Sequence, residues 1–112
     1  MQIIKLKDID ISDTPHKVSI KKLFTFEHAS VVHIELLKGE TLKLHITPVD
    51  ALFYVLKGKG FVEIGDEIQE ISQDQLIFSP AGIKHRLFNE SSESFQFLVI
   101  KVPNPTNQTK IL

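Results

Sequence analysis

Two histidines, His45 and His85, are the residues of this chain best suited to chemistry. A neutral imidazole can ligate a divalent metal ion, and a histidine with a tuned pKa can act as a general acid or base. His85 lies in the run Pro80-x-Gly82-x-x-His85-x-x-x-Asn89. The sequence contains no cysteine. Thiolate catalysis, thiolate metal sites and disulfides are therefore excluded.

Short apolar or alternating runs, separated by turn residues, must position these histidines. The runs are residues 31–37, 42–46, 52–56, 61–64, 67–71, 76–79, 85–89 and 95–102. All five glycines lie between the runs, and no proline lies inside one. This is typical of strands, because proline cannot donate a hydrogen bond to a β-ladder and glycine permits turn geometry. The regular spacing predicts an all-β sandwich or barrel.

The run that ends at Asn89 resembles the second signature motif of the cupins, position for position. The segment from Gly39 to Gly60 resembles the first cupin motif, since Gly39, five residues and then His45 match its start. The resemblance implies a small antiparallel jelly-roll β-barrel of cupin type. Every second residue of a barrel strand points into the lumen. Under the cupin pairing, His45 and His85 would meet there.

Two positions of the first motif depart from the cupin pattern. The second histidine of the family is Thr47 in this chain, and the family's glutamate is Ala51. A catalytic metal normally has three protein ligands and an open position. A divalent metal such as Zn, Fe, Mn or Ni would therefore be held weakly by the two histidines. A third ligand would come from Asp50 or Glu35.

Without the missing ligands, the lumen is interpreted as a small-molecule pocket. Its expected lining is His45, Thr47, Phe53, Val55 and His85. This mostly apolar set with a few polar groups is the composition of a ligand site. The imidazoles could contact an anionic or carbonyl-bearing ligand. We therefore expect a stand-alone cupin that binds a small molecule in its lumen, with a degenerate and weak metal site.

Two alternatives stay open at this point. The first is a metal-dependent enzyme of the isomerase or dioxygenase type that uses His45 and His85. The second is a sensing or accessory dimer without chemistry. The fold does not decide between them, because one fold hosts many unrelated activities.

Composition restricts the partners and the location. The net charge of −1 leaves no basic excess for neutralising phosphates, so nucleic acid is not expected as a partner. No apolar run approaches the roughly twenty residues of a membrane span. The N-terminal residues also lack the layout of a signal peptide. We therefore expect no membrane partner and a cytoplasmic location.

Residues 1–112 are predicted to form a single cupin domain. Residues 1–30 would supply an N-terminal strand or arm. Residues 103–112 would form an extended C-terminal tail that packs poorly, because they are polar and punctuated by prolines. The run 95–102 is apolar on both faces beyond Gln96, which indicates a partner subunit on one face and hence a homodimer.

The remaining histidines are interpreted as structural or surface residues. His16 and His28 lie in polar surroundings and are expected at the surface. His33 is expected on the outer face of its strand, because its sequence neighbours form the apolar set. Asn89 ends its run, and its side chain is expected to bond to loop backbone.

Overall fold

The computed structural model describes residues 1–106 and 109–112, which form ten strands and one short 3-10 helix, η1 (Leu6–Asp8). The strands are β1 (Ser19–Phe26), β2 (Ala29–Leu36), β3 (His45–Ile46), β4 (Asp50–Lys57), β5 (Lys59–Ile64), β6 (Glu67–Ser72), β7 (Leu76–Ser79), β8 (His85–Phe88), β9 (Phe95–Val102) and β10 (Lys110–Ile111). None of the described residues forms a helix long and apolar enough to cross a membrane.

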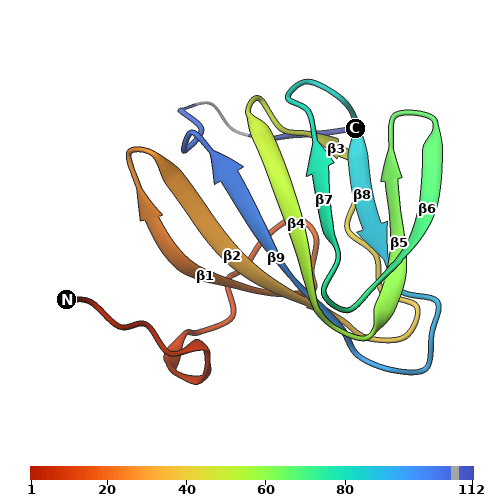
Figure 1. The fold of residues 1–112 in the computed structure, drawn as a ribbon, viewed down its shortest axis with the longest axis horizontal. Helices are drawn as coiled ribbons and strands as arrows, with labels where there is room; N and C mark the ends of the chain where they lie inside the picture. The colour runs from red at the N-terminus through yellow and green to blue at the C-terminus, as the bar shows by residue number, and fades with distance from the viewer. Residues whose placement is uncertain (107–108) are drawn as a thin grey trace.

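Two five-stranded antiparallel sheets face each other (Figure 1). One sheet has the order β1-β2-β9-β4-β7, and the other has the order β10-β3-β8-β5-β6. Strands that are neighbours in a sheet are mostly distant in sequence, as β2 and β9 are. The predicted all-β jelly-roll barrel is therefore confirmed, and its interior is the space between the two sheets.

The core lies between the sheets and is centred on β4 and β9. Phe53 and Val55 of β4 point inward, as do Phe95 and Phe97 of β9, and all four are at most 1% exposed. They are spaced two residues apart because side chains alternate across a strand. This alternation fixes which residues of every strand face the interior.

The opposite face of the first sheet is also largely apolar. Its residues come from β4, β7 and β9 and include Leu52, Tyr54, Leu56, Leu76, Phe78, Leu98 and Ile100. Leu76 and Phe78 are 60% and 56% exposed. The predicted apolar character of both faces of 95–102 is thus seen along the centre of the sheet.

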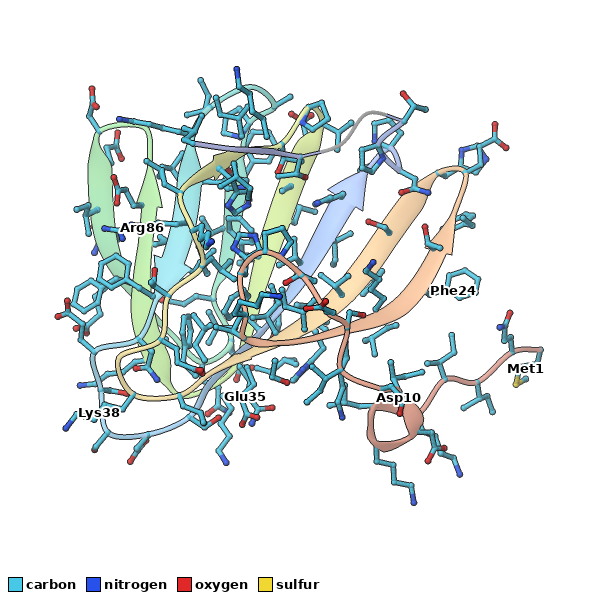
Figure 2. The ribbon with its side chains drawn as sticks, turned by 180° about the vertical axis from the view of Figure 1, so that it is seen from behind. Met1, Asp10, Phe24, Glu35, Lys38 and Arg86 are labelled. Atoms are coloured by element: carbon cyan, nitrogen blue, oxygen red, sulfur yellow. The ribbon has the colours of Figure 1, made fainter. Side chains whose placement is uncertain are left out.

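Segments near both ends of the chain contribute to the wall of the barrel opening. The segment between Asp10 and β1 crosses the middle of the molecule in Figure 2. The tail returns to the second sheet, where Ile111 pairs with His45 and Lys110 pairs with Ile46. The predicted extended tail thus contributes a two-residue strand to the edge of the second sheet, and both of its residues are exposed. Residues 107–108 of the predicted tail lie outside the described residues.

Glycine is required at two positions near the core and the site. A Cβ atom at Gly60 would lie 2.4 Å from the ring of Phe95, which is too close for any side chain. Gly82 has a φ of +78°, in the left-handed region that glycine adopts without strain. Gly82 therefore forms the turn between β7 and β8.

Candidate ligand-binding site

His45 and His85 meet in the barrel interior, as predicted. They are direct partners in the register of β3 and β8, and their Nε2 atoms are 3.0 Å apart. Both side chains are buried. The rings of Phe53 and His85 form a T-shaped pair, with centroids 5.3 Å apart.

The turn from residue 80 to 82 fixes the approach of β8. The Gly82 N–H donates to the Thr47 carbonyl at 3.0 Å, which ties the turn to the end of β3. The Ala81 N–H donates to the Asp50 carboxylate at 2.9 Å. The proline-glycine spacing ahead of His85 therefore acts through backbone geometry, by anchoring the start of its strand.

Hydrogen bonds assign the protons of the imidazole pair. His45 Nδ1 lies 2.6 Å from the Lys43 carbonyl and must donate to it, so its Nε2 carries a lone pair when the ring is neutral. The Nε2–H of His85 donates to that lone pair. His85 Nδ1 then accepts from the Ser79 hydroxyl at 2.6 Å. The Thr47 hydroxyl lies 3.3 Å from His85 Nε2.

Burial keeps the imidazoles neutral. Burial and, to a smaller extent, the proximity of His45 lower the pKa of His85 to about 3. Burial also lowers the pKa of His45, although the hydrogen bond to the Lys43 carbonyl opposes this shift. At neutral pH the pair therefore carries no formal charge.

A third imidazole, that of His16, lies at the site. Its ring packs edge-on against His45 with centroids 4.9 Å apart, and its Nδ1 accepts from the Lys43 N–H at 2.8 Å. Burial lowers the pKa of His16 to about 4. The prediction of a surface position for His16 is wrong, because the N-terminal segment folds over the opening. His28 is exposed, as predicted.

A cavity of about 430 Å³ opens beside these histidines. Its apolar wall includes Ile20, Val32, Ile34, Leu42, Phe53 and Val99. Its polar wall includes Thr14, His16, Lys22, His45, His85 and Lys101. The volume lies within the range of small-molecule sites in proteins, and so does the combination of an apolar wall with a few polar groups.

Three of the five residues predicted to bind the ligand line this cavity, namely His45, Phe53 and His85. Thr47 and Val55 share the inward parity but lie behind the lining, with 1% and 0% exposure. The hydroxyl of Thr47 contacts His85, which does line the cavity. Val55 belongs to the apolar core.

Two lysines of the lining were not anticipated from the sequence. Lys101 lies two residues beyond Val99 and four beyond Phe97, so it points to the same inward face of β9. The alternation of side chains along this strand could have predicted its position. Its Nζ donates to the Thr109 hydroxyl at 3.3 Å. Burial lowers the pKa of Lys101, and the neighbouring charge of Lys22 lowers it further. Lys22 is the more exposed of the two.

The two carboxylates expected as a third metal ligand lie elsewhere. Asp50 is exposed and accepts the hydrogen bond of Ala81. Glu35 is on the outer face of β2, where it accepts from Ser94 and Gln96, and Figure 2 shows it at the edge of the molecule. His33 is on the same outer face, as predicted, with its Nε2 3.1 Å from Gln96 Oε1.

The donor set does not fit a three-ligand metal centre. Within residues 1–106 and 109–112, no group of three histidine, aspartate or glutamate side chains is placed to hold a metal ion. The cavity instead presents two imidazoles that hydrogen-bond directly to each other. A catalytic metal site normally needs three protein ligands.

A double-sheet antiparallel barrel with histidines from two paired strands in its interior defines the cupin class of protein. The family described as Cupin domain matches residues 32–101, which is more than half of the chain. The chain belongs to the cupin family.

Similar proteins share this barrel over most of their length. A protein of Thermus thermophilus with a known crystal structure is 30% identical in sequence to this chain. The two structures superpose with a TM-score of 0.80, and the match covers 94% of this chain and 100% of the Thermus chain. An uncharacterised protein of Methanocaldococcus jannaschii is 26% identical over 77% of this chain and 75% of its own length. The polyketide cyclase RemF from Streptomyces resistomycificus has a TM-score of 0.87 at 17% identity, covering 100% of this chain and 85% of RemF. This last likeness concerns the fold alone.

Proposed function

We propose that this cupin binds a small organic molecule in its lumen, beside the His45–His85 pair. The cavity is the observation that carries this proposal. Its apolar wall would cover the hydrocarbon part of a ligand, and its polar groups converge from β3, β8, β9 and the N-terminal segment. Such a combination orients a small molecule and desolvates it.

An unsatisfied hydroxyl in the cavity wall supports the same proposal. Thr14 Oγ1 is buried and has no hydrogen-bond partner among the described residues. A buried polar group without a partner costs roughly 1–3 kcal/mol. A polar group of a ligand in the cavity would supply the partner, since Thr14 lines it.

The metal-dependent alternative has less support from the site. The two imidazoles of the pair provide two ligand nitrogens, and the Asp50 and Glu35 carboxylates expected as a third ligand hydrogen-bond elsewhere. Two imidazoles alone support only a weak divalent metal site. In the binding proposal the same histidines are neutral wall groups held in place by their mutual hydrogen bond and by Lys43 and Ser79.

A steric block of the cavity tests the proposal. Val32 lines the cavity from β2, and the adjacent Val31 faces the other side of the sheet. Small acids and carbonyl compounds that raise the thermal midpoint of the native protein should lose this effect in Val32→Phe. They should keep it in Val31→Phe, which adds the same bulk outside the cavity. An equal response of both variants would contradict lumen binding, as would a broad metabolite panel without any response.

A further inference from the structure

The formal charges in the cavity wall are all positive. Lys22 and Lys101 line the cavity, and no aspartate or glutamate does so among the described residues. Within that part of the chain, neither lysine forms an ion pair with a carboxylate. A partly buried cation is stable only when paired or well hydrogen-bonded. The one side-chain bond of Lys101 that the structure shows, to the Thr109 hydroxyl, leaves its charge uncompensated.

The neutral groups around the lysines add hydrogen-bond donors. His16 Nδ1 accepts from the Lys43 backbone, so the proton of the neutral ring is on Nε2. The unpartnered Thr14 hydroxyl can also donate. The cavity therefore combines an ammonium group with an N–H and an O–H donor. A ligand that complements this set must bring acceptor atoms and negative charge.

We propose that the ligand is a small carboxylate whose anionic end pairs with Lys101 and whose hydrocarbon part lies toward Phe53. This inference rests on the proposed lumen binding and names its ligand class. Lys22, which is more exposed, adds longer-range attraction at the opening. A carboxylate fits better than a phosphate, because most of the wall is apolar and none of the described residues that line it is an arginine.

Pairs of probes that differ only in charge test the ligand class. Benzoate and benzamide have nearly the same shape, as do hexanoate and hexanamide. We expect calorimetric titration of the native protein to give at least about tenfold tighter binding of each acid than of its amide, the factor expected of one charged hydrogen bond. Phosphate should bind more weakly than the acids.

Lysine variants test which side chain gives the cavity its preference for an acid over the matching amide. Lys101→Met keeps the length of the side chain and removes its charge, so the acid should lose its advantage while the amide binds unchanged. Lys22→Met should reduce acid binding by a smaller factor, because an exposed charge is screened by solvent. Lys59→Met, at an exposed position of β5, is the matched control and should bind as the native protein does. Circular dichroism verifies that each variant is folded.

The possible failures are distinguishable. Equal binding of acid and amide by the native protein would overturn the carboxylate class and leave lumen binding intact. An acid preference that survives in Lys101→Met would overturn the role of Lys101. Absence of binding by every probe, acid and amide alike, would overturn the carboxylate proposal and count against lumen binding itself.

Discussion

The protonation state of single side chains decides what the cavity can bind. His85 and His16 have pKa values lowered to about 3 and about 4, because burial penalises their charged forms. Neutral rings leave Lys101 and Lys22 as the only formal charges of the lining within the described residues. The same burial must make the stability of the protein depend on pH.

We expect the free energy of unfolding to fall as the pH is lowered from about 6.5 towards 5. In this window the unfolded chain binds protons at His85 and His16, whereas the folded chain does not, so acid favours unfolding. Above about pH 6.5 this contribution to stability is fully present. Urea unfolding at a series of pH values measures the slope.

Histidine variants assign the slope to particular rings. In His16→Gln the slope of the unfolding free energy with pH should fall by an amount equivalent to at most one proton. The variant removes a ring that stays neutral in the folded state and is protonated in the unfolded chain. His28→Gln should leave the slope unchanged, since His28 is exposed. A free energy of unfolding that does not change between pH 7 and 5 would contradict the neutral state of His85 and His16 in the folded protein.

Residues in the motifs and in regular strands carried a sequence signal, whereas a residue of the irregular N-terminal segment did not. The motif spacing placed His45 and His85 in one interior, because paired strands bring fixed positions together. His16 reached the site through the fold of an irregular segment, which has no periodic signal. Lys101 had a signal, since it continues the alternation of its strand.

At the scale of the elements, Asn89 joins three parts of the fold. Its side-chain amide donates to the Leu36 carbonyl at 2.9 Å, at the end of β2, and to the Glu93 carbonyl at 2.7 Å. Its Oδ1 accepts from the Ser91 N–H at 2.8 Å in the loop before β9. The predicted bonding of Asn89 to loop backbone is confirmed, and Asn89 also hydrogen-bonds to the end of β2.

We expect Asn89→Asp to lower the free energy of unfolding by about 3 kcal/mol, since it replaces a buried double donor with an acceptor that faces two carbonyls. Chemical denaturation at neutral pH measures this loss. The control is Gln69→Glu, the same kind of change at an exposed position of β6. A loss below about 1 kcal/mol would show that the loop rearranges to satisfy these carbonyls.

The strands themselves were predictable because the alternation and the turn residues agree along most of the chain. The exception is 42–46, of which only His45 and Ile46 form a strand. Leu42 and Leu44 use their backbone groups for single bonds to Leu87 and Leu112 instead. A run of alternating residues cannot reveal that its partners change along its length.

At the scale of the whole molecule, the outer face of the first sheet is largely apolar over β4, β7 and β9 and exposes Leu76 and Phe78. It consists of residues of β4, β7 and β9 whose inward neighbours already form the core. A sheet covered on one face usually shows polar residues on the other. We propose that a second copy of the chain covers this face, as the composition of 95–102 predicted.

A charge on the outer face should therefore separate the subunits without unfolding the barrel. We expect the native protein to have the mass of a dimer in light scattering after size-exclusion chromatography. Phe78→Glu should shift it to the monomer, because its side chain lies 56% exposed on this face. Ile68→Glu places the same charge at an equally exposed position of β6, in the other sheet, and should leave the dimer intact. Loss of the dimer in both variants would place the interface elsewhere, and a native monomer would contradict the proposal.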